Sequence, residues 1–507
     1  MVDVSIIKED SSTENFGVIH NPDFDMANYN SELSKARDST LLNIRQIPST
    51  GALSIPKCIS FKNSGNTQIS NLGPNNPNFE PEFASQIIKS LNSKNIVNFA
   101  LQVIAEADND SRQLQNLANS ILLEESLTET LQIENIPQEI ICSILRIISS
   151  LFPLADPEKI QTKYSDDLFF VINNLLQNST DSSEVLFTTI SFISVLSFYS
   201  AYARDMFIQN EVHIILLQIC KNFMENIDLQ IICCKSFIQI LSNPAEIEIS
   251  TLPNCIEPLF HLLSSPSKDV LNLVIQSFVE LTNRMPSLTV TLFNNGLFQG
   301  LIQFLQDEDL IVSCLHLIGN MSLSQADHIQ KILEYGLFDA LLSILGSVHN
   351  ADIFWILSNM LESAPYLILP LFSPDFLKNA IEIGIHGSFE VQKEVAFFFS
   401  TLIIHTDSEN LPIICSHETI TLITEMLGCG VLDIIIRCLD SIVRIIFFFS
   451  QNIHTAGQLL AELEECDIRG QLDQITEQSS HLIKQRVLKL YHLLDQLDQS
   501  IQLSPNN

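Results

Sequence analysis

Basic residues, glycine and tryptophan are scarce in this chain of 507 residues. It has 26 Lys and Arg against 59 Asp and Glu, which gives a formal net charge of −33. A surface of that sign repels phosphate and attracts cations, so nucleic acid is excluded as an expected partner and basic peptides or proteins are favoured. Only 15 Gly and 19 Pro interrupt the chain, which leaves room for long helices.

Cysteine pairs at metal-ligand spacing and long apolar runs are missing as well. The 11 cysteines are scattered and no secretory signal is found, so we expect reduced thiols in an intracellular protein with no metal and no cofactor. The most apolar C-terminal run, residues 431–449, is broken by Asp433, Arg437, Asp440 and Arg444. It cannot supply the about 20 apolar residues of a transmembrane helix, so we expect no membrane partner.

Catalytic motifs are also absent. The sequence contains no glycine-rich phosphate loop, no H-E-x-x-H and no paired Cys-x-x-Cys. The stretch HTDSE (405–409) gathers four chemically active side chains, but a catalytic constellation needs a shaped pocket, and this stretch is typical of a polar loop between helices. The sequence therefore predicts a protein that is not an enzyme.

Composition divides the chain into an arm and an array. Asn, Ser, Pro and Gly are frequent in residues 1–78 and apolar periodicity is weak there, which indicates disorder. Within this arm we expect a disordered acidic tail (1–30), an amphipathic segment able to form a helix on a partner (31–48) and a flexible linker (49–78). The helical array is expected at 79–495, followed by a disordered tail at 496–507.

Internal repetition identifies the type of array. The stretches NNGLFQGLIQFL (294–305) and EYGLFDALLSIL (334–345) superimpose with Gly296 and Gly336 forty positions apart. A period near 40 in a chain without strand signatures indicates armadillo or HEAT units, which bury their apolar faces only against their neighbours. We therefore expect an all-α, right-handed superhelical armadillo-repeat solenoid of nine or ten units.

The single tryptophan of the sequence lies in the stretch IFWILSNML (353–361), one helical turn before Asn359. Asn359 precedes Asp375, at the start of the next helix, by sixteen residues, and Asn320 precedes Gly336 by the same interval. This spacing places both asparagines at the same point of successive third helices, the helices expected to line the inner surface.

In these residues the sequence resembles the importin-α family of nuclear import adaptors, whose third helices carry W-x-x-x-N. The stretch LEECDIRGQLDQITEQSSHLIKQRVLKLYHLL (463–494) is similar to the last repeat of that family. ELSKARDSTLLNIRQIP (32–48) is similar to its importin-β-binding segment, with Lys35, Arg37 and Arg45 as the matching basic residues. The resemblance implies an adaptor that moves between cytoplasm and nucleus, links cargo to importin-β and binds basic nuclear-localisation peptides.

Binding an extended basic peptide requires aromatic walls for lysine stems, amides for the peptide backbone and carboxylates for the ammonium or guanidinium groups. Trp355, Asn359 and Asp352 supply all three on one helical face. The neighbouring units supply fewer of these groups. The candidate peptide-binding residues are Trp355, Asn359, Asp352, Asn320, His316, Glu394, Phe397 and Asn243.

Each of these residues also has an ordinary structural interpretation. A tryptophan within a helix is often a core residue, asparagines often cap helices, and acidic side chains keep an array soluble. The alternative hypothesis is therefore an armadillo scaffold that binds proteins without import activity. A HEAT-like regulatory subunit is the third possibility.

Overall fold

The computed structural model describes residues 79–107, 112–156, 166–178, 183–243, 250–478 and 481–502. Every regular element within these ranges is a helix. The expected segments 1–30, 31–48 and 49–78, with Lys35, Arg37 and Arg45, lie outside the described residues. The described residues divide into two compact units, 79–321 and 322–502, which we call the N-terminal half and the C-terminal half.

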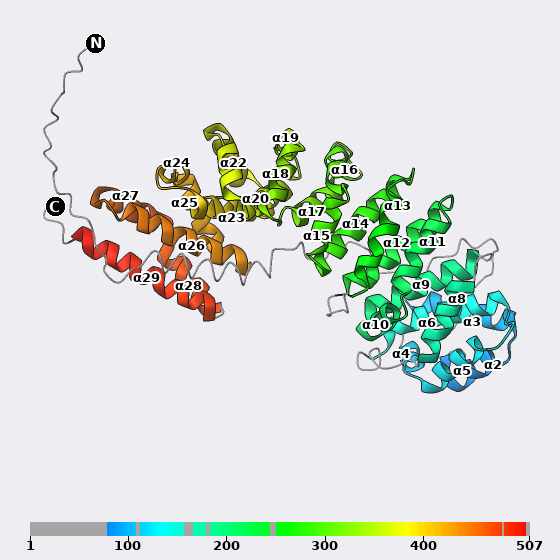
Figure 1. The fold of residues 1–507 in the computed structure, drawn as a ribbon. Coiled ribbons are helices and arrows are strands. Elements are labelled where there is room, and N and C mark those ends of the chain that lie inside the picture. Colours follow the sequence, from blue (N-terminus) through cyan, green and yellow to red (C-terminus); the bar gives the residue numbers. More distant parts are fainter. Residues whose placement is uncertain are drawn as a thin grey trace, which may run out of the picture. The chain divides into compact units, whose positions relative to one another are not determined.

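The N-terminal half is a stack of helical units whose last helices pack on one another in sequence order. These third helices are α3, α6, α9, α12, α14 and α17, and each contacts the next (Figure 1). The elements are α2 Pro81–Lys89, α3 Ser93–Ala107, α4 Arg112–Ala118, α5 Ile121–Leu131, α6 Gln138–Leu151, η3 Phe152–Leu154, α8 Asp166–Asn178, α9 Ser183–Tyr199, α10 Ala201–Gln209, α11 Val212–Asn222, α12 Ile227–Ser242, η4 Leu252–Cys255, α13 Ile256–Leu262, α14 Lys268–Arg284, α15 Leu288–Asn294, α16 Leu297–Phe304 and α17 Ile311–Met321.

The C-terminal half repeats the arrangement, with α20, α23, α26 and α29 as its stacked third helices. Its elements are α18 Ala326–Glu334, α19 Leu337–Ile344, α20 Asn350–Ser363, α21 Pro365–Ile368, η5 Leu369–Leu371, α22 Pro374–His386, α23 Phe389–His405, α24 Leu411–Ile414, α25 His417–Glu425, η6 Met426–Gly428, α26 Leu432–Phe449, α27 Ile453–Glu465, α28 Ile468–Gln478 and α29 His481–Gln502. The expected end of the array at residue 495 falls inside α29, where Leu497 is buried.

Three helices per unit, as in α10–α11–α12, α15–α16–α17 and α18–α19–α20, distinguish armadillo units from the two-helix HEAT unit. The expected all-α armadillo-repeat fold is confirmed. None of the described helices combines the length and the apolar character needed to cross a membrane. Likewise, no group of three or more metal-ligating side chains is found in the described ranges.

The turn between the first and second helices of a unit explains the repeated glycine. Gly296 and Gly336 immediately precede α16 and α19 with φ of +79° and +83°, a left-handed conformation that glycine adopts without steric cost. Glu211 before α11 and Asp467 before α28 adopt the same conformation, with φ of +56° and +52°. The turn therefore recurs in units that lack the glycine, although a side chain there is strained.

Phenylalanine rings fill the core between three elements of the C-terminal half. Phe354 of α20 lies 5.5 Å from Phe398 of α23, measured between ring centroids. Phe372 lies 5.1 Å from Phe398 and stacks on Phe376 of α22 at 5.2 Å. Such aromatic pairs stabilise a core beyond the apolar area that they bury, and they fix α20 and α23 against each other.

His213 of α11 is a buried titratable group in the N-terminal half. Its side chain is fully buried, and its Nε2 lies 3.0 Å from the hydroxyl of Thr251. Burial lowers the pKa of His213 from 6.5 to about 4, because the charged imidazolium loses its hydration there.

We predict opposite effects for two glycine substitutions four residues apart in the same unit. Gly296→Ala should lower the free energy of unfolding by about 1 kcal/mol, because alanine is strained at φ of +79°. Gly300→Ala, in the middle of α16 and equally free of nearby atoms, should raise it by about 0.5–1 kcal/mol through helix propensity. Urea unfolding of both variants measures the difference, and a shift of the same sign in both would contradict the assigned turn.

We also predict that protonation of His213 in the unfolded chain lowers stability in acid. Between its unfolded pKa of 6.5 and its folded pKa of about 4, the unfolded state binds the extra proton, so stability is lost as pH falls through this window. This histidine should account for about 2 kcal/mol of the stability lost between pH 7 and pH 5. His213→Asn should remove that contribution, and His261→Asn, at an exposed position of α13, should retain it.

Candidate interaction surface on the third helices

Trp355 and Asn359 lie one turn apart on α20, as the sequence predicts. The indole is only 5% exposed and the amide 4%, so neither side chain stands open to solvent as a wall of a groove. Asp352, one turn earlier on the same helix, is partly exposed. Of the three groups on α20 that were expected to bind a peptide, the Asp352 carboxylate is therefore the most accessible to a partner.

The next third helix, α23, carries Glu394 and Phe397. Glu394 is partly exposed, whereas Phe397 is buried. The guanidinium carbon of Arg437, from α26, lies 5.4 Å from the centre of the Phe397 ring. The aromatic face on α23 is therefore already in contact with a cation of the chain itself.

Glu362, near the end of α20, receives the same guanidinium. Its Oε1 lies 2.6 Å from Arg437 Nη2, and its Oε2 lies 3.3 Å from His405 Nε2 of α23. The sequence interpretation missed all three residues. Glu362 follows Asn359 by three positions and so shares its helical face, and this was the signal that could have found it.

In the N-terminal half, Asn320 uses its amide to join two third helices. It lies on α17, and its Nδ2 donates to Thr282 Oγ1 and to Asn283 Oδ1 of α14, each at 2.9 Å. Its Oδ1 is buried without a hydrogen-bond partner in the described chain. His316, one turn earlier on α17, is partly exposed.

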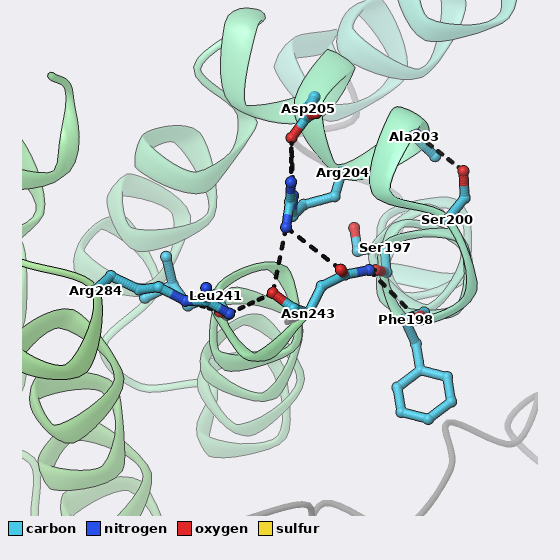
Figure 2. A network of polar contacts seen from close by, with 9 residues as sticks. All are labelled: Ser197, Phe198, Ser200, Ala203, Arg204, Asp205, Leu241, Asn243 and Arg284. Atoms are coloured by element: carbon cyan, nitrogen blue, oxygen red, sulfur yellow. Dashed lines mark hydrogen bonds and ion pairs between the residues drawn. The ribbon is translucent and has the colours of Figure 1, made fainter. Parts of the chain in front are cut away.

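Asn243 differs from the other two asparagines because it follows α12 instead of lying within a third helix. Its Nδ2 donates to the carbonyl oxygen of Ser197 at 3.0 Å, at the end of α9 (Figure 2). Its Oδ1 and its backbone oxygen both accept from Nη1 of Arg204, at 3.3 and 3.2 Å. Both ends of this amide are thus used to connect helix ends inside the protein.

Two arginines complete this network. Arg204 of α10 is fully buried, and its Nη2 lies 2.6 Å from Asp205 Oδ1. Arg284, at the end of α14, donates through Nε to the Leu241 carbonyl at 2.7 Å and through Nη2 to the backbone oxygen of Asn243 (Figure 2). A cation at a helix C-terminus satisfies carbonyls that lack intrahelical partners and opposes the helix dipole.

The structure thus distributes the eight predicted residues between the two halves. Asp352, Trp355, Asn359, Glu394 and Phe397 lie on the adjacent helices α20 and α23 of the C-terminal half. His316, Asn320 and Asn243 belong to the N-terminal half. The first group lies on two third helices that pack against each other, and we call it the α20–α23 surface; Asp352 and Glu394 are its partly exposed members.

We predict that Asn243 contributes to stability. Asn243→Ala removes the donor to Ser197 and one acceptor of the buried Arg204, and unsatisfied buried groups of this kind cost about 2 kcal/mol. Asn295→Ala is the matched control, because the Asn295 amide makes a single exposed hydrogen bond in the same half. Urea unfolding should show a change below about 0.5 kcal/mol for this control, and equal changes for the two variants would contradict the structural role of Asn243.

Comparisons with known proteins bear on the fold. Neither the protein-family models nor the curated proteins include a match to the chain. Among solved structures, an engineered protein from a structural genomics consortium aligns with a TM-score of 0.56 at 13% identity, over 81% of this chain and 98% of its own. A designed armadillo repeat protein aligns with a TM-score of 0.39 at 18% identity, over 47% of this chain and 99% of its own.

The first of these likenesses shows a shared fold and, at that identity, nothing of function. Three-helix units stacked through their third helices give this chain an armadillo-like scaffold, an architecture that presents extended surfaces for binding other proteins.

Proposed function

We propose that this protein is an interaction adaptor that binds a basic, extended segment of a partner along the inner helical layer, in the manner of an importin-α-like import adaptor. The observation that carries the proposal is the α20–α23 surface. There the partly exposed carboxylates of Asp352 and Glu394 lie on two third helices that pack against each other. They belong to a chain whose formal net charge is −33.

The chemistry of this surface favours cations. Carboxylates accept charge-assisted hydrogen bonds from ammonium and guanidinium groups, and an acidic surround raises the rate at which a basic segment arrives. Trp355 and Phe397, each three residues after one of these carboxylates on the same helix, are buried. Recognition at this surface therefore depends more on charge than on aromatic walls.

A scaffold that binds proteins without import activity is the second candidate. The observation that favours it is the use of Asn243 and Asn320 to connect neighbouring helices, because an amide held in this way does not offer its donors to a peptide backbone. The two candidates share the surface and differ in partners: the adaptor also requires importin-β, through the segment that contains Lys35, Arg37 and Arg45.

We predict that a labelled, lysine-rich nuclear-localisation-type peptide binds the full chain and that binding weakens with salt. Fluorescence anisotropy should show the loss as the Debye length falls from about 30 Å to about 8 Å. Asp352→Asn combined with Glu394→Gln should weaken binding about tenfold at low salt. Glu382→Gln, at an exposed position of α22, is the matched control and should leave the affinity unchanged.

Two outcomes separate the hypotheses. Peptide binding together with capture of importin-β, lost when Lys35, Arg37 and Arg45 are all changed to Ala, supports the import adaptor. Peptide binding without importin-β capture supports the scaffold. No binding of the peptide at low salt would contradict the proposed binding of basic segments.

A further inference from the structure

Arg437 reaches across the inner helical layer of the C-terminal half. It lies near the start of α26, yet its guanidinium lies over Phe397 of α23 and forms an ion pair with Glu362 of α20. Three successive third helices thus contribute one group each to a single contact.

The other side of this contact consists of Glu362, Phe397 and His405. The Glu362 side chain is only 8% exposed, and its two oxygens face two different cationic or polar nitrogens, Arg437 Nη2 at 2.6 Å and His405 Nε2 at 3.3 Å. The Phe397 ring supplies a flat surface parallel to which a planar cation can lie. The carboxylate and the ring match a guanidinium group, which combines a planar face with several directed donors, and the imidazole contacts the second oxygen of the carboxylate.

The Arg437 side chain is more exposed than the Glu362 side chain that it contacts. Arg437 is 21% exposed, and its long unbranched stem has several rotatable bonds, so the guanidinium can leave towards solvent without moving the helix that carries it. If it leaves alone, Glu362 is a buried carboxylate without its main cation, which is costly. If another guanidinium takes its place, the same bonds are restored.

We propose that Glu362, Phe397 and His405 form a guanidinium-binding site that Arg437 fills within the chain and that an arginine side chain of a bound partner takes over. The existence of the site is independent of the partner's identity, whereas its use by a partner rests on the proposed function. Arg437 is then an internal competitor: it lowers the apparent affinity for arginine-containing segments by the fraction of time that it occupies the site.

Chemical rescue tests the site without any peptide. Arg437→Ala in the full chain should unfold at a lower temperature than the wild type, because the Glu362 carboxylate loses its guanidinium. Saturating ethylguanidinium should raise the Tm of this variant by about 3 °C, through binding to the folded state alone. Ethylammonium, which lacks the planar group, should raise it less, and the wild type should gain nothing from either compound.

Two controls make the result specific. Glu362→Gln combined with Arg437→Ala should show no rescue, because the carboxylate is gone. Arg146→Ala should also show none: Arg146 of α6 pairs with Glu184 at 3.1 Å, but the Glu184 side chain is 57% exposed, so water replaces the lost cation. Should Arg437→Ala fail to fold, Arg437→Gln fills more of the same space and is measured in the same way.

The partner side is measured with an arginine-rich peptide. Arg437→Ala should bind it about tenfold more tightly than the wild type, since the internal competitor has been removed. Rescue by ethylguanidinium without peptide binding in either protein would support the site and overturn the proposed function. Absence of rescue in both Arg437→Ala and Arg437→Gln would overturn the site, whatever the peptide does.

Discussion

The structure depends on one constraint: an armadillo unit cannot bury its apolar residues by itself and must do so against its neighbours. The third helices show this most strongly. In α23 every residue from Val395 to Ile403 is buried, so only the two ends of the helix reach the surface. Recognition by α23 is confined to these ends, and Glu394 lies at the first of them. On α20 likewise, Asp352 near the start of the helix is partly exposed, whereas Trp355 is buried.

Four arginines of the described residues are used to connect helices within this acidic chain. Arg284 and Arg444 donate to carbonyls at the ends of α12 and α23, respectively, while Arg437 and Arg486 pair with the carboxylates of Glu362 and Asp440. Both carboxylates are buried. Arginines paired in this way do not offset the acidic charge at the surface, and this supports the proposed binding of basic partners.

The periodic features of the fold could be predicted from the sequence. The interval between Gly296 and Gly336 reflects a turn of the same left-handed conformation, and the interval between Trp355 and Asn359 places both on one third helix. These features are local, so spacing alone determines them. The contact of Arg437 with Glu362 could not be predicted in this way, because it joins residues 75 positions apart that lie on α26 and α20, two helices that both pack against α23. Asn243 is a candidate peptide-binding residue in the sequence, but α12 ends one residue before it and its amide connects helix ends instead.

The network around Asn243 has a mechanical consequence for the N-terminal half. It fastens the carboxyl ends of α9 and α12 to α10 and to the end of α14. A stack of helical repeats changes its curvature when neighbouring units separate along one edge. At the carboxyl ends of these helices, separation would break hydrogen bonds made by Arg204 and Arg284. We therefore expect the units to resist opening along this edge. Bending should open the opposite edge, where the amino ends of the same helices lie.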